Sequence, residues 1–198
     1  MILENIMAKL PLPPLPLPIA PPSTVKNSGS ERAKKSGRRT LAAKRKTLLE
    51  ELWGDELEQL KVWNRHEHDG YTTVPRTLTY ISRILDYLGG TGQPLSQTYL
   101  ALWCRVFDEG FVEIKDKDGF AYEAGFSGQR AVTTWTGRMR KLRDLGFITT
   151  KPGTSGEFQY VILLNPLTVI KELYEGKEKD ERYNALVGRM QEVGAKWE

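Results

Sequence analysis

Apolar residues recur every three or four positions in several parts of the chain, which is the spacing of one face of an α-helix. The clearest case is the stretch 128–145, which predicts a long helix. Its apolar stripe consists of Val132, Trp135, Met139, Leu142 and Leu145. The opposite side is polar and basic, as on a helix that covers a core with one face only. That side contains Arg130, Thr133, Thr134, Gly137, Arg138 and Lys141, with Arg140 and Arg143 on its flanks.

Two more helices are predicted toward the N-terminus. One covers 40–63, where leucines lie at helical spacing and Gly54 introduces a break. The other begins at Pro75, which suits the first turn of a helix, and ends at the pair Gly89 and Gly90.

A further helix is expected over 96–107. Ser96 is placed as its N-terminal cap, and Leu95 is spaced to pack against Leu100. The expected buried side contains Leu100, Trp103, Val106 and Phe107, with Cys104 as a small core residue on the same side.

Short elements surround the long central helix. A strand is expected over 111–114 and a short helix over 118–124. The segment 125–127 predicts a turn between two helices, with Ser127 as the cap of the second. After the long helix a hairpin is predicted, with strands at 147–151 and 158–164 and a Gly-containing loop at 152–156.

The C-terminal part predicts two helices. The first runs from Asn165 to Tyr174, and the second is amphipathic. One face of the second carries Tyr183, Leu186, Val187, Met190, Val193 and Trp197. We expect this face to pack within the chain; the alternative is a homodimer formed through the terminal helices.

The N-terminal part has a different composition from the rest of the 198 residues. Seven of the twelve residues in 11–22 are proline, which excludes a helix and favours an extended conformation. We therefore expect a disordered arm over 1–39 that acts as a stiff spacer, or alternatively as a ligand for a proline-binding domain. No apolar run reaches the roughly 20 residues of a membrane span, and a single cysteine excludes a disulfide framework.

Positive charge is concentrated in two places. Residues 1–47 contain ten Lys and Arg against two Glu, so they carry +8, whereas the remaining residues carry −4 of the total +4. Within the remainder, 127–151 holds six basic residues and one acidic residue, Asp144. A local basic excess of this kind is typical of a surface that binds a polyanion.

The order of the predicted elements in 96–164 is helix, strand, short helix, turn, long helix and hairpin. This order resembles the winged helix-turn-helix superfamily, and the segment Met139 to Ile148 resembles its junction between recognition helix and wing. The wider region 72–165 is similar to uncharacterised bacterial proteins, some from mobile elements. The resemblance implies that the long helix enters the major groove of double-stranded DNA.

Arginine can pair with guanine through two hydrogen bonds, and threonine offers a methyl group to thymine. The predicted base contacts are Arg130, Thr133, Thr134 and Arg138. The predicted phosphate contacts are Arg140, Lys141 and Arg143, together with Lys151 at the wing. Because the turn is one residue longer than its tightest form, the register of these contacts stays open by one position.

Candidate catalytic and metal-binding residues are few. His66 and His68 are the only histidines, and their spacing does not suit one helical face. Asp116 begins a segment that is similar to a calcium loop, but its twelfth position is Ser127, where glutamate is required. We expect no enzyme activity, no cofactor and no metal.

The predicted fold class is α+β and mostly helical, with a winged helix-turn-helix core and extra helices at both ends. The predicted organisation is an arm at 1–39, a helical extension at 40–95, the winged domain at 96–164 and C-terminal helices at 165–198. The predicted function is that of a cytoplasmic, nucleoid-associated transcriptional regulator that reads DNA. The alternatives are a plasmid or mobile-element replication protein and a winged-helix module that docks other proteins without binding DNA.

Overall fold

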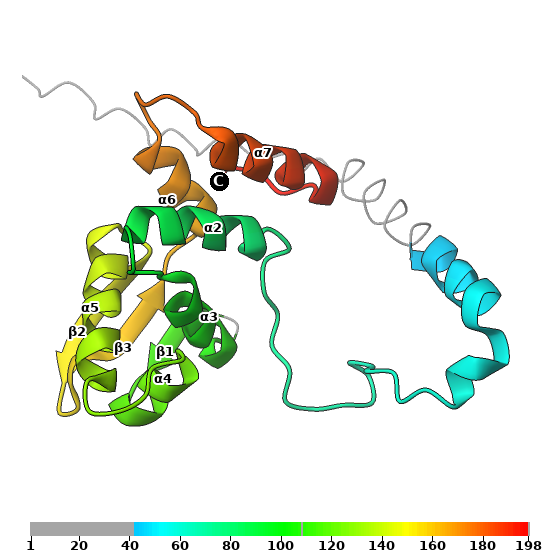
Figure 1. Ribbon diagram of the computed structural model, residues 1–198, viewed down its shortest axis with the longest axis horizontal. Helices are drawn as coiled ribbons and strands as arrows, with labels where there is room; N and C mark the ends of the chain where they lie inside the picture. Colours follow the sequence, from blue (N-terminus) through cyan, green and yellow to red (C-terminus); the bar gives the residue numbers. More distant parts are fainter. Residues whose placement is uncertain (1–41, 108, 198) are drawn as a thin grey trace, which may run out of the picture. The chain divides into compact units, whose positions relative to one another are not determined.

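The structure is a computed structural model that describes residues 42–107 and 109–197 (Figure 1). The expectations for the arm at 1–39, including its disorder, lie outside the described residues. The chain divides into two units, 1–62 and 63–198, which are considered separately below.

In the first unit, residues 42–53 form a helix that is followed by the 3-10 helix η1 (Gly54–Glu58). The break expected at Gly54 is confirmed, and this glycine has a φ of 43°. The predicted extension of the helix to residue 63 is wrong, because residues 59–62 have no regular helix. The leucines of this helix are exposed, so its apolar residues do not form a core of their own.

The second unit combines helices with one small antiparallel sheet, which confirms the α+β class. Its helices are α2 (Leu78–Gly89), α3 (Ser96–Arg105), α4 (Lys117–Glu123), α5 (Ala131–Asp144), α6 (Pro166–Leu173) and α7 (Glu181–Val193). Its strands are β1 (Phe111–Glu113), β2 (Ile148–Gly153) and β3 (Gly156–Leu163). The strand order is β1-β3-β2, and both pairs are antiparallel.

One face of the sheet closes the core. Alternate residues of the strands, such as Val112 and Val161, are at most 3% exposed, whereas Phe111 and Ile162 on the other face are 48% and 45% exposed. Helices α3, α4 and α5 contact one another, and α5 also contacts β2. Trp135 of α5 is fully buried and packs against Phe158 of β3, with ring centroids 5.9 Å apart.

The C-terminal helices pack onto the same unit. Asn165 caps α6 by accepting a hydrogen bond from the backbone N–H of Leu167. Helix α7 packs against α2, and Arg182 stacks on the ring of Tyr87 at 3.6 Å. The amphipathic face of α7 is thus used within the chain, where Tyr183 is buried.

Helix α3 differs most from its prediction. Its buried residues are Thr98, Tyr99, Ala101 and Leu102. Leu100 is 38% exposed and Phe107 is 91% exposed, so the prediction that both lie on the buried side is wrong. The helix ends at Arg105, so the last two residues of the predicted buried side, Val106 and Phe107, lie outside it. Cys104, predicted in the core, is exposed.

The starts of two helices also differ from prediction. Ser96 does not cap α3; its backbone N–H and its hydroxyl both donate to the carboxylate of Asp86, at 2.8 Å each. Ser127 does not cap α5, which begins three residues later than predicted, after Gly128 with a φ of 78°.

Candidate nucleic-acid interface

Helix α5 has one side in the core and one side facing outward. Trp135, Met139 and Leu142 are fully buried, as the apolar stripe predicted. Helix α5 therefore has a fixed orientation about its axis, because rotating the helix would expose this apolar stripe to water. The outward side carries Arg130, Thr133 and Gly137, which are exposed, and Thr134 and Lys141, which are half-buried.

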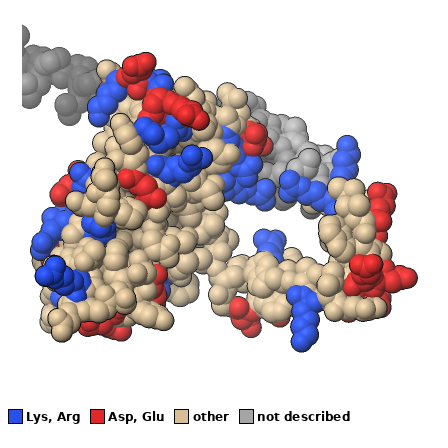
Figure 2. Space-filling view, in the orientation of Figure 1, with Lys and Arg blue, Asp and Glu red and all other residues tan. Residues whose placement is uncertain are grey.

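Three predicted cationic contacts have no carboxylate partner among residues 42–107 and 109–197. These are Arg130 before α5, Lys141 near its end and Lys151 on β2. Figure 2 shows Lys and Arg side chains gathered along the edge where α5 and the hairpin of β2 and β3 lie, with acidic side chains close by. The three residues provide positive charge that an incoming polyanion meets without first breaking an ion pair.

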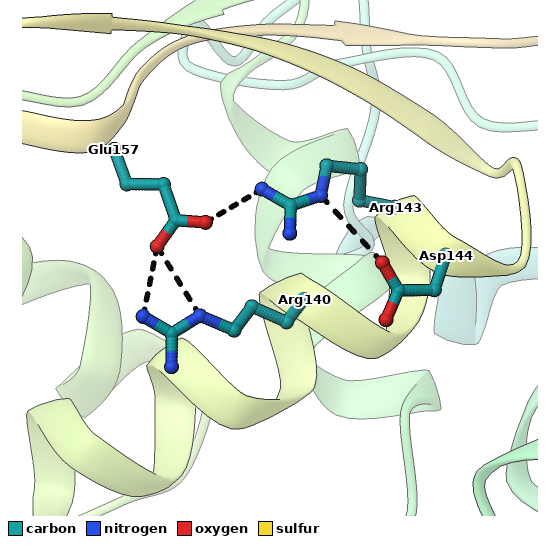
Figure 3. Close-up of polar contacts among 4 residues, drawn as sticks. All are labelled: Arg140, Arg143, Asp144 and Glu157. Atoms are coloured by element: carbon teal, nitrogen blue, oxygen red, sulfur yellow. Dashed lines mark hydrogen bonds and ion pairs between the residues drawn. The ribbon is translucent and has the colours of Figure 1, made fainter.

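Arg140 and Arg143 are held by a single carboxylate, Glu157 at the start of β3 (Figure 3). One Glu157 oxygen accepts from Nη2 of Arg140 at 2.9 Å, and the other accepts from Nη1 of Arg143 at 2.6 Å. Arg143 also lies 3.7 Å from Asp144 and stacks over the ring of Phe158. The expectation that Asp144 alone balances the charge of this helix is wrong, because β3 returns a second acid to it.

The pairing with two guanidinium groups lowers the pKa of Glu157. The hydrogen bonds from Arg140 and then from Arg143 are the main causes. Glu157 therefore stays ionised under ordinary conditions, and it cancels part of the positive charge that the sequence assigns to α5. The two ion pairs of Glu157 are exposed to solvent. They therefore hold the side chains in place more than they stabilise the fold.

Arg138, predicted as a base contact, has its partners in the loop before α3. Its two terminal nitrogens donate to Gln93 Oε1 at 3.2 Å and to the carbonyl of Gly92 at 3.1 Å. Its guanidinium also lies 6.0 Å from the ring centre of Phe126. These contacts tie α5 to the loop before α3, so the geometry gives Arg138 a structural role.

The hairpin turn is braced by a buried glutamine that the sequence did not single out. Gln159 is 5% exposed, and its Oε1 accepts from the backbone N–H of Ser155 at 2.8 Å and from the hydroxyl of Thr154 at 3.3 Å. Its amide nitrogen donates to the hydroxyl of Tyr160 at 3.1 Å. A Cβ at Gly153 would collide with the end of this side chain, so a larger residue there would displace the glutamine from its position under the turn. Only the alternation of apolar residues in β3 hinted at an inward-facing position here.

No alternative site with metal-binding or membrane-spanning character is present in the described residues. His66 and His68 are exposed, and within 42–107 and 109–197 no three His, Cys, Asp or Glu side chains gather in a metal-binding arrangement. The described helices include none that is long and apolar enough to pass through a bilayer.

The outward side of α5 thus carries hydroxyl groups and cations that have no ion-pair partner in the part of the chain that the structure describes, and it lies beside the β2–β3 hairpin with Lys151. Such a surface can donate hydrogen bonds to phosphate oxygens and to base edges. Comparisons of the chain with protein-family models, with curated proteins and with solved structures found no match.

Proposed function

We propose that this protein binds double-stranded DNA in a sequence-specific manner, as a winged helix-turn-helix protein that places α5 in the major groove. Two features support the winged-helix assignment. The order of elements from α3 to β3 is the order that the resemblance implies, and the β2–β3 hairpin follows directly after α5. An α-helix with its side chains is about 10–12 Å across, which fits the major groove of B-form DNA.

The outward side of α5 is the observation that carries the proposal. Arg130 and Lys141 stand on it without ion-pair partners in the described chain, and Thr133 lies between them. A helix face that only faces solvent usually carries balancing acids within reach of its cations. Here the two acids near the helix, Glu157 and Asp144, form ion pairs only with Arg140 and Arg143 on its flank.

The geometry refines the proposed contacts. Arg130, Thr133 and Thr134 are assigned to base edges, and Lys141 and Lys151 are assigned to phosphates. Arg140 and Arg143 reach phosphate only if they exchange Glu157 for it, and Arg138 is withdrawn from the base contacts because it binds Gly92 and Gln93.

A binding-site selection experiment tests the proposal. The full chain is used to select sequences from a pool of random duplexes, and the affinity for the selected site is then measured for Arg130→Ala. Loss of one bidentate base contact should cost about 1–3 kcal/mol at that site and leave the weak background binding in place. Lys171→Ala is the matched control, because Lys171 is an exposed cation on α6, away from this surface.

Two results would contradict the proposal. The pool would show no enrichment of any sequence, or Arg130→Ala would bind the selected site as tightly as Lys171→Ala does. Given enrichment, the positions of the preferred sites in a genome decide between a transcriptional regulator, which we favour, and a replication protein of a plasmid or mobile element.

A protein-docking module is the second candidate function, and one observation favours it. Glu157 neutralises Arg140 and Arg143, so two of the six basic residues in 127–151 are already paired. A docking module would give no enrichment in the selection and no salt-dependent retention of DNA.

A further inference from the structure

A groove follows the free edge of β1 on the second unit. It has a volume of about 940 Å³ and is bounded on one side by β1 and on the other by the extended segment 70–73. Cys104 to Phe107, at the end of α3, form its third boundary. The 70–73 boundary is fixed, because the hydroxyl of Thr72 donates to the carbonyl of Val106 at 3.1 Å.

The backbone of β1 presents unused hydrogen-bonding groups to this groove. Gly110 accepts from Leu163, and Ile114 donates to Gln159, so the even-numbered positions of this segment face β3. In an antiparallel ladder successive residues direct their N–H and C=O groups to opposite edges. The N–H and C=O groups of Phe111 and Glu113 therefore face the free edge, and no described residue pairs with them. Such an edge is a template for one more strand.

The groove offers apolar contact without net charge. Its two charged side chains are both paired outside it, Arg105 with Glu123 and Glu113 with Lys115. The remaining large side chains are aromatic and exposed, namely Tyr71 at 51%, Phe107 at 91% and Phe111 at 48%. An uncharged peptide is favoured here, because a charged one would lose hydration without gaining an ion-pair partner.

Residues 14–19, which lie outside the described residues, have the sequence Pro-Leu-Pro-Leu-Pro-Ile. A peptide at a sheet edge needs N–H groups only at every second residue, and proline is tolerated at the positions that face away. In this segment the N–H groups belong to Leu15, Leu17 and Ile19, which are spaced by two, and every intervening residue is proline. The flanking sequence 11–22 contains no charged residue, which suits the neutral groove.

We propose that the groove binds an extended, uncharged peptide in which apolar residues alternate with proline, and that residues 14–19 of a second copy of this chain are its occupant. The peptide adds to β1 as a further strand. The backbone N–H groups of Leu15, Leu17 and Ile19 face the free edge, where Phe111 and Glu113 present their own backbone groups. Proline rings pack well against exposed aromatic side chains such as Phe107. The prolines leave the outer edge of the added strand without donors, so the sheet does not extend further.

The single cysteine of the chain reports occupancy of the groove. Cys104 is exposed and lines it, so a bound peptide should slow the reaction of its thiol with a chromogenic disulfide reagent. The full chain carrying L15D, L17D and I19D should react several-fold faster than the unaltered chain at high protein concentration. A synthetic peptide of residues 11–22, added to the altered chain, should restore the slow rate. In the unaltered chain, protection should increase with protein concentration, because the occupant comes from another copy.

A modified peptide separates strand addition from apolar packing alone. Methylation of the backbone nitrogens of Leu15, Leu17 and Ile19 removes the donors and keeps every side chain. This peptide should give no protection. Equal protection by both peptides would overturn strand addition, and absence of protection by the unmodified peptide would overturn the proposal as a whole. Protection that does not depend on protein concentration would overturn the second copy as the source. None of these readouts depends on DNA.

Discussion

At the scale of single residues, Glu157 determines how much of the positive charge on α5 is accessible to a ligand. It holds Arg140 and Arg143 at once, at 2.9 and 2.6 Å (Figure 3). These ion pairs are exposed, and exposed ion pairs contribute little to stability, so their removal leaves the fold intact. The same removal frees Arg140 for phosphate and leaves Arg143 with only its longer ion pair to Asp144, at 3.7 Å.

Glu157→Gln should therefore bind DNA more tightly and with a steeper salt dependence. Each additional phosphate contact adds about 0.9 to the slope of log affinity against log salt, so the two arginines together add up to about 1.8. Fluorescence anisotropy with a labelled duplex over a salt series measures this. Glu123→Gln is the matched control, because it removes one carboxylate from an exposed arginine, Arg105, that does not lie on α5. Equal slopes for the two variants would show that Arg140 and Arg143 do not contact the duplex.

Tyr99 carries a buried hydroxyl that makes no hydrogen bond of ordinary geometry within the described residues, and the side chain of Trp103 acts on it only as a weak polar neighbour. Its ring is fully buried between Trp103 and Phe147, and burial raises its pKa to about 12. The unfolded chain releases this proton near pH 10.0, the ordinary value, while the folded chain retains it. Stability should therefore fall as the pH rises from about 10 to about 12.

Tyr99→Phe should remove this part of the alkaline destabilisation. The variant should be at least as stable as the unaltered protein near pH 8, because it loses an unsatisfied polar group. Its advantage should grow by about 1 kcal/mol near pH 11. Urea unfolding at the two pH values measures both effects, and Tyr122→Phe, at a 77% exposed tyrosine, serves as the control. A constant difference between the two pH values would contradict the proposed ionisation.

At the scale of elements, the hairpin depends on Gln159. This side chain satisfies the N–H of Ser155 and the hydroxyl of Thr154, and it fixes the turn beside Lys151. Gln159→Leu should leave the Ser155 N–H unpaired in a confined turn, at a cost of about 1–3 kcal/mol. Hydrogen exchange at Ser155 should accelerate, whereas exchange in α5 should not. Thr149→Val, at an exposed position of β2, should leave exchange at Ser155 unchanged. If exchange at Ser155 is the same in both variants, Gln159 does not brace the turn.

Some helices could be predicted from the sequence because only one set of apolar residues has the spacing of a helix face. In α5 the positions Trp135, Met139 and Leu142 have no rival arrangement, and all three are fully buried. In α3 a second stripe competed, since Leu95, Tyr99 and Leu102 are also spaced by four and three. The second stripe is the buried one, and propensity alone does not decide between two such faces.

The charge state of the candidate site could not be predicted from local sequence. Glu157 lies 17 residues from Arg140 and 14 from Arg143, and only the return of β3 brings them together. The contacts of Arg138 with Gln93 and Gly92 span an even longer separation. A count of charges along one helix misses both, because hydrogen bonds between distant segments depend on the tertiary fold.

At the scale of the whole molecule, the N-terminal and remaining parts of the chain carry opposite net charge. Residues 1–47 carry +8 and the rest carries −4, so under the proposed function we expect general attraction to DNA to depend on the N-terminal part. Replacement of Lys34, Lys35, Arg38 and Arg39 by glutamine should weaken binding to every duplex and lower the salt slope by up to about 3.6. The proline-rich segment stays intact in this variant, so the effect is separate from any peptide binding at the groove.

The ranking of sites should stay the same in the four-glutamine variant, because contacts with phosphate carry no direct sequence information. Arg130→Ala should have the opposite effect: it should change the ranking of sites and keep most of the slope of log affinity against log salt. Binding-site selection with each variant, analysed at two salt concentrations, compares the two effects in one experiment. A changed ranking in the four-glutamine variant would mean that the N-terminal part contributes to recognition of the DNA sequence. In that case α5 alone would not determine the specificity.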